Sequence, residues 1–206
     1  LRNNTGILGC SDNGPAPDAG RADPFLGYKT HLYEGGIRSP LIAWGPGIDV
    51  RQNVVDRESV FSAVDLVPTL LELTKTPAPE DVVFDGEPLS DTLLGTALGT
   101  GLGSRSAPIF FRRPPDRDSF YGDDDLPDLA VRSGKWKFLC EYDGGDPELY
   151  DLDADRSETT NQVDQYPDVA KQLEQQLLRW HQSMPPDKGA TYKRKPAKKP
   201  SGKKSR

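Results

Sequence analysis

Two apolar runs, each ending at a turn, decide the fold of the N-terminal part. Residues 5–14 read TGILGCSDNG, and residues 40–47 read PLIAWGPG. Short apolar runs that stop at glycine, proline or Asx residues are typical of buried strands. We therefore expect a buried strand over residues 5–10 and a second apolar strand over residues 40–44, with a glycine- and proline-rich loop over residues 14–27 between them.

A helical pattern begins at Asp65. The apolar residues of one helix face follow at the expected spacing: Leu66, Val67, Leu70, Leu71 and Leu73. Asp65 is suited to the N-cap, and Pro68 is tolerated because it falls in the first turn. Residues 75–107 are rich in Pro, Gly, Asp and Thr, so we expect a long irregular connection with one short helix near Leu93. We place the domain boundary in this connection.

Short strands and one helix are predicted after this boundary. The strands are expected at residues 108–111, 129–132, 135–141 and 148–152. Ser133 and Gly134 form a two-residue hairpin signal between the second and third strands. A helix from Pro167 to about Met184 carries apolar residues at steps of three and four: Val169, Leu173, Leu177, Trp180 and Met184. These elements predict a small antiparallel sheet with one amphipathic helix packed on it.

Composition and charge argue against two classes of protein. No run in the 206 residues reaches the roughly 20 apolar residues that span a bilayer. Residues 193–206 hold eight Lys/Arg and no Asp/Glu, whereas the other 192 residues hold 18 basic and 32 acidic groups, a net charge of −14. So acidic a body argues against a nucleic-acid-binding domain. We expect residues 187–206 to be a disordered basic tail, the alternative being contact with an acidic partner.

Cysteine and histidine usage restricts the kind of metal site. Cys10 and Cys140 make neither a disulfide framework nor a zinc set, and His31 and His181 are too far apart in sequence for a histidine-based site. Any metal is therefore expected on oxygen ligands.

Asp12 and Asn13 are the candidate oxygen ligands. They follow the first predicted strand, where an α/β sheet usually presents its ligands. A carboxylate beside an amide carbonyl suits Ca²⁺ or Mg²⁺. The alternative is an Asx turn that ends the strand without binding a ligand.

Each charged residue of the next loop has two interpretations. Lys29 is either an anion ligand or a solvated surface lysine, and His31 is either a proton donor or a packed ring. Glu34 and Arg38 flank two glycines, and we expect them to form an ion pair that holds a sharp turn.

The order and spacing of these residues resemble a signature of the formylglycine-dependent sulfatases. The family pattern is S-D-N-G, then G-x-K, then Y-E-G-G-x-R-x-P, followed by an apolar strand and W-x-P-G. The matching segments of this chain are Ser11 to Gly14, Gly27 to Lys29, Tyr33 to Pro40 and Trp44 to Gly47.

The resemblance extends along the chain up to the basic tail. Residues 65–71 are similar to the family's D-x-x-P-T-L-L helix, and residues 130–137 to its A-V-R-x-G-x-x-K strand pair. Residues 85–89 resemble D-G-x-S-L, with proline in place of serine. Residues 148–158 resemble E-L-Y-D-L…D-P-x-E, with Arg156 in place of the proline.

The resemblance implies roles for four residues. Asp12 and Asn13 match the family's ligands of a divalent cation, usually Ca²⁺, with Mg²⁺ as the alternative. Lys29 matches the lysine that donates to a sulfate oxygen, where a fixed cation stabilises the charge that develops. His31 lies two residues further and is the weaker candidate for substrate contact or proton transfer. Lys29 and His31 are thus the candidate catalytic and substrate-binding residues.

The family nucleophile has no match in this chain. It is a formylglycine made from the Cys or Ser of a C-x-P/A-x-R motif, and neither Cys10 nor Cys140 lies in such a motif. We interpret both as thiols of buried strands. Because the chain does not begin with Met, we expect the formylglycine segment to precede Leu1 in a longer protein, and we expect the chain alone to be inactive.

The resemblance implies an α/β fold of the alkaline-phosphatase superfamily in three parts. Residues 1–104 are expected to be the C-terminal part of the catalytic α/β sandwich. Residues 105–186 are expected to be the small antiparallel sheet-and-helix subdomain, and residues 187–206 the basic tail. We expect folding to depend on the preceding segment, because the first strands would otherwise have exposed edges.

The implied function is sulfuric ester hydrolysis, as in arylsulfatases and N-acetylgalactosamine-6-sulfatases. The implied substrate is a sulfated small molecule or glycan, and the implied compartment is periplasmic, secreted or lysosomal. Two alternatives stay open: a non-catalytic remnant that binds a cation or an anionic glycan, and a phosphate-ester hydrolase of the same superfamily. The E-G-G-x-R-x-P and E-L-Y-D-L motifs favour the sulfatase.

Overall fold

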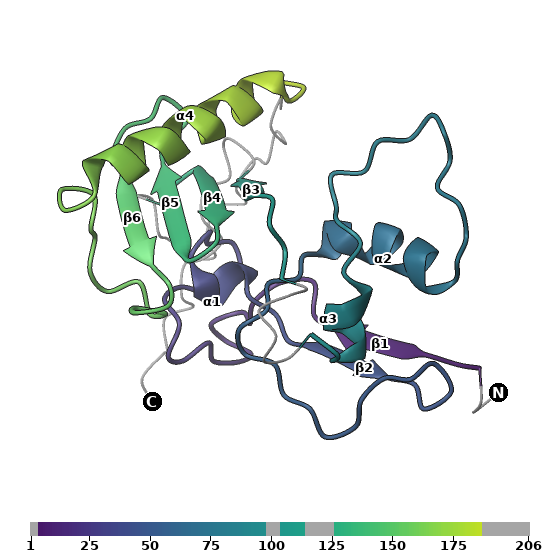
Figure 1. The fold of residues 1–206 in the computed structure, drawn as a ribbon. Helices are drawn as coiled ribbons and strands as arrows, with labels where there is room; N and C mark the ends of the chain where they lie inside the picture. Colours follow the sequence, from purple (N-terminus) through teal and green to yellow (C-terminus); the bar gives the residue numbers. More distant parts are fainter. Residues whose placement is uncertain (1–3, 98–103, 114–125, 187–206) are drawn as a thin grey trace, which may run out of the picture.

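The computed structural model describes residues 4–97, 104–113 and 126–186. Figure 1 shows a four-stranded sheet under a long helix, and a two-stranded ribbon with short helices beside it. All strand pairs in the described residues are antiparallel. The predicted mixed α/β class is therefore confirmed.

The four-stranded sheet is an antiparallel meander. Its strands, in spatial order, are β3 (Ile109–Arg112), β4 (Leu129–Ser133), β5 (Trp136–Cys140) and β6 (Glu148–Asp151). Gly134 takes a φ of +57° in the turn that pairs Ser133 with Trp136, a conformation that glycine adopts without strain. The predicted hairpin is confirmed.

One face of this sheet is covered by α4 (Pro167–Ser183), as Figure 1 shows. Proline suits the first helical position because its missing N–H would have no partner there. Leu173 and Leu177 of the predicted stripe are 4% and 0% exposed and pack on the core that contains Leu129 and Phe138. The helix therefore closes a core with the sheet, as its apolar periodicity predicts.

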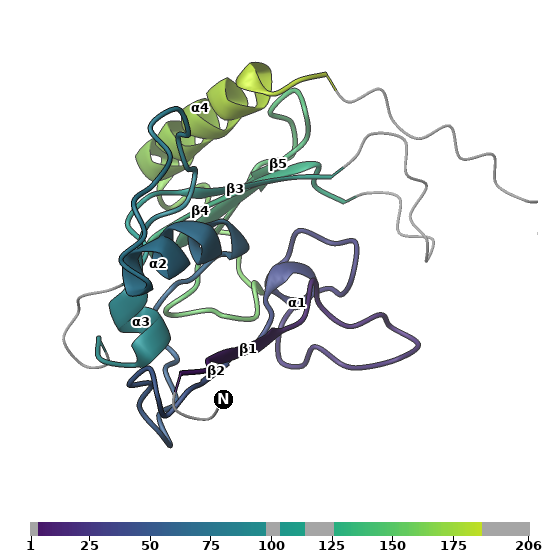
Figure 2. The same ribbon diagram turned by 90° about the vertical axis from the view of Figure 1, so that its right-hand side faces the viewer.

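The opposite face of the sheet packs on a segment from the N-terminal half. Leu32 and Tyr33 are buried against Ala130, Leu139 and Tyr150. Directly after them comes α1 (Glu34–Ile37), a single helical turn where the sequence predicted a sharp turn. Figures 1 and 2 both show α1 between the sheet and the ribbon. The sheet is thus buried on both faces, and α1 is the joint between the two halves of the molecule.

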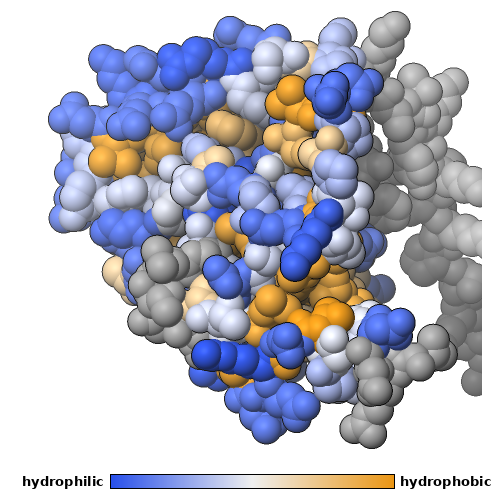
Figure 3. All heavy atoms as spheres, turned by 45° about the vertical axis from the view of Figure 1, so that its right-hand side comes forward, coloured by the Kyte–Doolittle hydropathy of each residue, from blue (hydrophilic) through white to orange (hydrophobic). Residues whose placement is uncertain are grey.

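The ribbon consists of β1 (Ile7–Cys10) and β2 (Leu41–Trp44), at the two predicted positions. The prediction that the first of these strands is buried is wrong for this chain, and the second strand is exposed as well. Ile7 is 57% and Ile42 65% exposed, and orange apolar side chains lie open to solvent on the lower part of the molecule in Figure 3. The described residues supply no layer that covers the ribbon, so its apolar side chains stay in contact with water.

Three short helices follow the ribbon: η1 (Ala63–Asp65), α2 (Leu66–Leu73) and α3 (Ser90–Leu94). The predicted helices near Leu66 and Leu93 are confirmed, but the predicted apolar face of α2 is not its buried face. Val67 and Leu70 are 53% and 42% exposed, whereas Thr69 is fully buried. Thr69 accepts a hydrogen bond from the backbone N–H of Leu89 (3.0 Å), which ties α2 to the residues before α3.

Asp65 precedes α2 but does not cap it with its side chain. Its buried carboxylate accepts hydrogen bonds from the backbone N–H groups of Ser62 (2.7 Å) and Glu87 (2.9 Å), and it pairs with Arg105. The predicted N-cap role is therefore replaced by a buried ion pair that fastens the irregular connection of residues 75–107.

The predicted tail, residues 187–206, lies outside the described residues, as do residues 98–103 inside the predicted boundary. Among the described helices, none combines the length and the apolar character needed to cross a bilayer.

Candidate functional site

Asp12 and Asn13 lie in the turn directly after β1. The Asn13 side-chain amide donates to Oδ1 of Asp12 (2.5 Å), and the Ser11 hydroxyl donates to the backbone carbonyl of Asn13 (2.9 Å). The side-chain bond uses the amide N–H and one carboxylate oxygen, so the second carboxylate oxygen and the amide oxygen remain as acceptors. The turn thus keeps two hard oxygen acceptors on neighbouring residues.

Lys29 is held next to this turn by the backbone. Its N–H donates to the carbonyl of Pro15 (2.9 Å), two residues after Asn13, and its side chain is exposed. The N–H of Gly14 donates to the carbonyl of Gly36 (2.8 Å), which fixes the same turn to α1. The structure therefore brings together the backbone of the two segments on which Asp12, Asn13 and Lys29 lie.

Glycines allow these segments to approach so closely. A Cβ atom on Gly14 would collide with the carbonyl oxygen of Gly35, and one on Gly36 would collide with that of His31. Neither position has room for a side chain, because the atoms in the way belong to the backbone and cannot turn aside.

His31 is buried rather than presented to solvent. Its ring is 8% exposed and lies 4.0 Å from the ring of Tyr28, centroid to centroid. Its side chain also covers Gly27, where an added Cβ would come within 2.8 Å of Nδ1. The packed-ring interpretation fits this placement. In the sequence, His31 follows Lys29 by two positions, so both residues belong to the same loop.

Thr30, between Lys29 and His31, has an unusual backbone conformation. Its φ is +88°, which is rare for a β-branched residue, and its hydroxyl oxygen is buried without a hydrogen-bond partner among the described residues. Strain of this kind persists only where the surroundings fix the backbone, and it often accompanies binding sites.

The first residue of α1, Glu34, lies at the centre of a buried ionic network. It is 1% exposed, and its carboxylate lies 3.1 Å from Arg38, 3.2 Å from Lys137 and 3.8 Å from Arg132. The predicted pair of Glu34 with Arg38 is confirmed, and two further cations share the same carboxylate.

Glu158 completes the network from the far end of the chain. Its carboxylate lies 2.8 Å from Nζ of Lys137, which is fully buried, and it accepts the backbone N–H of Glu34 (2.6 Å). Residues from α1, β5 and the segment after β6 therefore meet at a single interior point. Lys137 and Glu158 were identified from the sequence only as positions of two motifs, and their contact was not predicted.

Burial and charge act in opposite directions on these carboxyl groups. Burial tends to raise the pKa of Glu34, but Lys137, Arg132 and Arg38 outweigh burial and hold that pKa below its usual value. For Glu158 burial prevails over the attraction of Lys137, and the pKa is raised. Lys137 is thus the cation on which both buried carboxylates depend.

Next to this network, Tyr33 links the segment before α1 to β6 by a hydrogen bond from its uncharged hydroxyl group. Its hydroxyl donates to the carboxylate of Glu148 (2.9 and 3.0 Å), and the hydroxyl of Tyr150 donates to the same group (2.9 Å). Burial, and then the negative charge of Glu148, raise the pKa of both tyrosines well above the ordinary value. Both hydroxyls therefore keep their protons and act as donors.

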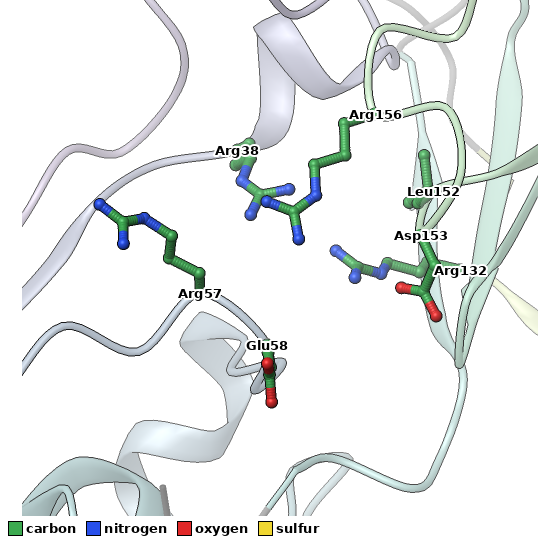
Figure 4. Close-up of a pocket in the computed structure, with 7 residues that line it drawn as sticks. All are labelled: Arg38, Arg57, Glu58, Arg132, Leu152, Asp153 and Arg156. Atoms are coloured by element: carbon green, nitrogen blue, oxygen red, sulfur yellow. The ribbon is translucent and has the colours of Figure 1, made fainter. Parts of the chain in front are cut away.

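A pocket of about 350 Å³ opens beside the network. Its lining contains four arginines from four segments: Arg38, Arg57, Arg132 and Arg156. Figure 4 shows the guanidinium groups of Arg38, Arg132 and Arg156 directed toward a common space. Sequence analysis missed this pocket, although the arginine at position 156, in place of the family proline, was a usable signal.

The chain offers only part of a metal site. No group of three or more His, Cys, Asp or Glu side chains within the described ranges could hold a metal ion. Asp12 and Asn13 would supply two oxygen ligands, whereas Ca²⁺ takes six to eight. The donor chemistry fits a hard divalent cation, and the remaining ligands would come from outside the described residues.

The two strand cysteines differ in environment. Cys140 is fully buried, and burial, followed by the charges of Glu174 and Glu141, raises the pKa of its thiol to about 12. Cys10 is exposed, so the prediction of a buried thiol is confirmed for Cys140 and wrong for Cys10.

Comparisons with known proteins give a consistent result. The model of the family described as Sulfatase matches residues 1–76. An N-acetylgalactosamine-6-O-sulfatase of Bacteroides thetaiotaomicron is 30% identical over 204 residues, which cover 86% of this chain and 36% of that protein. Arylsulfatase K of Mus musculus is 32% identical over 153 residues, covering 73% of this chain and 26% of the relative.

Solved structures give the same picture. A structure from work on the metabolism of multiple glycosaminoglycans by Bacteroides thetaiotaomicron superposes with a TM-score of 0.66 at 29% identity, over 89% of this chain and 40% of the other. The structure of Ps i-CgsB in complex with a neocarrahexaose has a TM-score of 0.68 at 23% identity and covers 87% of this chain and 37% of the other. The second likeness shows the fold alone. In each comparison the chain spans well under half of its relative, and this coverage fits the predicted C-terminal portion.

Proposed function

The chain belongs to the sulfatase family, and from that premise we propose that it supplies part of the cation and sulfate site of a sulfuric ester hydrolase. The observation that carries the proposal is the hydrogen bond from the Lys29 N–H to the Pro15 carbonyl (2.9 Å). It joins the loop of the candidate sulfate ligand to the turn of the candidate metal ligands.

In this proposal Asp12 and Asn13 bind a divalent cation, Ca²⁺ in the first instance and Mg²⁺ as the alternative. The adjacent carboxylate and amide oxygens of this turn support the assignment. The cation, when bound, polarises a sulfate oxygen as a Lewis acid. The divalent cation and the formylglycine are family properties; neither Cys10 nor Cys140 lies in the formylglycine motif.

Lys29 is proposed to donate to a sulfate oxygen. Its exposed ammonium group on a loop fixed by backbone hydrogen bonds supports this role, because a cation that is already in position needs no reorganisation during the reaction. The neighbouring Thr30 has a strained backbone conformation, which indicates that the surrounding residues impose the shape of this loop.

His31 is proposed to contact the substrate or to transfer a proton from the wall of the same loop. Its ring is packed on Tyr28, which would hold it in one orientation. Of the four assignments it has the least support, because packing alone also accounts for the burial of its ring.

The proposed substrate is a sulfated glycan. The names of similar proteins support this class: the Bacteroides thetaiotaomicron relative is an N-acetylgalactosamine-6-O-sulfatase, and another structural neighbour was solved with D-glucosamine-2-N,6-O-disulfate. Turnover by the 206-residue chain itself is not expected, because the nucleophile motif is not matched in it.

Backbone NMR during a titration with CaCl₂ tests the metal assignment on the chain as it stands. We expect amide shifts confined to residues 11–14, abolished in Asp12→Ala and retained in Asp18→Ala, which removes an exposed carboxylate from the same loop. Shifts that persist in Asp12→Ala would remove this turn from the metal site.

The coding sequence upstream of Leu1 tests the catalytic assignment. An in-frame C-x-P/A-x-R segment predicts that the polypeptide containing it hydrolyses 6-sulfated N-acetylgalactosamine, and that Lys29→Ala lowers kcat by about a hundredfold. The matched control is Lys171→Ala, an exposed lysine on α4, which should leave kcat unchanged. Absence of the segment would favour the non-catalytic remnant, and unchanged kinetics in Lys29→Ala would remove that residue from the site.

A further inference from the structure

The arginine pocket concentrates positive charge from segments that lie far apart in the sequence. Arg38 follows α1, Arg132 lies on β4, Arg156 lies after β6, and Arg57 lies before η1. None of them belongs to the candidate set of Asp12, Asn13, Lys29 and His31. At about 350 Å³ the pocket is within the size range of small-molecule sites.

The carboxylates near the pocket do not balance this charge. The lining contains Glu58 and Asp153 against four arginines, which leaves a net charge of +2. In Figure 4 the carboxylate of Glu58 points away from the guanidinium groups. Within the described ranges, neither Arg57 nor Arg156 forms an ion pair.

Glu34, which contacts two of the pocket arginines, already has three cationic partners. One of its oxygens faces Arg38 at 3.1 Å and Arg132 at 3.8 Å, and the other faces Lys137 at 3.2 Å. A single negative charge among three cations cannot neutralise Arg156 as well. In the part of the chain that the structure describes, the side chains of Arg57 and Arg156 therefore have no carboxylate partner at ion-pair distance.

Bringing these cations together has an electrostatic cost. Burial lowers the pKa of Arg132; Glu34 and Asp153 counteract this, but the neighbouring charges of Arg38 and Arg156 lower the pKa further. An anion in the pocket would offset that repulsion, and guanidinium groups bind the oxygens of a tetrahedral anion through paired N–H donors.

We propose that this pocket binds a sulfate or phosphate group, with Arg38, Arg132 and Arg156 as its direct donors and Arg57 at the rim. The proposal goes beyond the sulfatase assignment, because it concerns binding by residues that take no part in that assignment. The concave shape favours a small ligand with one tetrahedral oxyanion over an extended polyanion, which requires a basic stripe along the surface.

Calorimetric titration of the 206-residue chain with sodium sulfate, at constant ionic strength in sodium chloride, tests the proposal. The variants are Arg156→Gln and Arg57→Gln, singly and together, since both side chains lie in exposed residues outside the Glu34 network. We expect the double variant to bind sulfate about tenfold more weakly or worse. The matched control Arg179→Gln removes one exposed arginine from α4 and should bind sulfate like the parent chain.

The source of the anion is resolved by a parallel titration with 6-sulfated N-acetylgalactosamine. Tighter binding than inorganic sulfate would support a sulfate carried on a sugar, and equal binding would support the free ion. Thermal unfolding of every variant checks that the fold is kept.

Three results would overturn the proposal. The parent chain could bind neither sulfate nor phosphate, or Arg179→Gln could weaken binding as much as Arg156→Gln. Sulfate binding could also vanish in Lys29→Ala and persist in the arginine double variant. That last result would place the sulfate at Lys29, so the arginine pocket would be excluded while the proposed function stood.

Discussion

The sheet-and-helix half and the N-terminal half, which contains the ribbon, differ in how much apolar surface they bury. In the sheet-and-helix half, Leu129, Leu149 and Leu177 are all 0% exposed, because α4 covers one face of the sheet and the Leu32 segment covers the other. In the ribbon, Ile7 and Ile42 are 57% and 65% exposed. The sheet and α4 enclose an apolar core between them, whereas the N-terminal half joins the sheet through Leu32 and Tyr33 and through the buried ionic contacts of Glu34. The candidate cation and sulfate ligands all belong to the N-terminal half.

The contrast is sharpest in the reactivity of the two cysteines. Cys10 on the ribbon is exposed, whereas Cys140 is buried with its pKa raised to about 12. Since the thiolate is the reactive form and Cys140 is reached only when the sheet opens, we expect alkylation of Cys10 to be faster by about a thousandfold or more. Iodoacetamide labelling followed by mass spectrometry measures both rates. Comparable rates in native buffer would mean that the sheet-and-helix core is not closed.

Lys137→Met breaks the polar joint between the halves. It leaves two buried carboxylates, Glu34 and Glu158, without their shared cation, and we expect a loss of about 3–5 kcal/mol in the free energy of unfolding. Urea denaturation measures the change.

Lys135→Met is the matched control for that experiment. Lys135 pairs with Asp151 at 2.6 Å, but its side chain is 46% exposed and solvent screens the pair, so we expect a much smaller loss of stability than in Lys137→Met. Adding Glu158→Gln to Lys137→Met should restore part of the lost stability, because one uncompensated charge is removed. Equal losses for the two lysine variants would show that the buried network does not join the halves.

Leu177→Ala and Ile42→Ala compare the apolar contributions of the two halves. Leu177 is 0% exposed in the core under α4, and its truncation should cost about 3 kcal/mol. Ile42 is 65% exposed on β2, and its truncation should cost less than about 0.5 kcal/mol. A large loss in Ile42→Ala would indicate that another layer covers the ribbon in solution.

Glu141 gives the smallest expected effect, a pH dependence confined to the sheet-and-helix half. Burial and the hydrogen bond with Asp128 raise its pKa to about 7. A raised pKa in the folded state stabilises the protein at low pH, and this stability is lost as the pH rises from about 4.5 to about 7. Because the group is largely solvated, we expect a change of at most about 1 kcal/mol.

The measurement is urea denaturation at pH 5 and pH 8. Glu141→Gln should reduce the loss of stability between these two values, whereas Glu80→Gln, an exposed residue of the irregular connection, should not. Identical pH slopes in Glu141→Gln and the parent chain would contradict the raised pKa.

Local pattern was enough to predict most of the secondary structure. The strands of the meander lie at the predicted positions, and the hairpin at Gly134 and the stripe of α4 follow from turn residues and helical spacing. The ribbon strands also lie where the apolar runs predicted them. Their burial could not be predicted in the same way, because burial depends on which other elements cover a strand.

In the candidate site, too, contacts between residues close in sequence could be predicted, whereas contacts between distant residues could not. The ion pair of Glu34 with Arg38 follows from their spacing in one turn of helix, whereas Lys137 and Glu158 reach Glu34 only through the tertiary fold. The arginine pocket likewise joins four segments that no sequence window contains. The roles of Asp12, Asn13, Lys29 and His31 rest on family resemblance and remain predictions.

The contact between Glu34 and Glu158 has a consequence for anyone who edits this chain. The two residues are 124 positions apart, yet the carboxylate of one holds the first backbone N–H of the short helix that follows the Lys29 loop. Grafting that loop onto another scaffold would therefore require Lys137 and Glu158 to travel with it. Positions 34, 137 and 158 therefore have to be kept together. In a chimaera with another sulfatase, a crossover between any two of them could replace one partner and remove the contacts that hold the helix after the Lys29 loop.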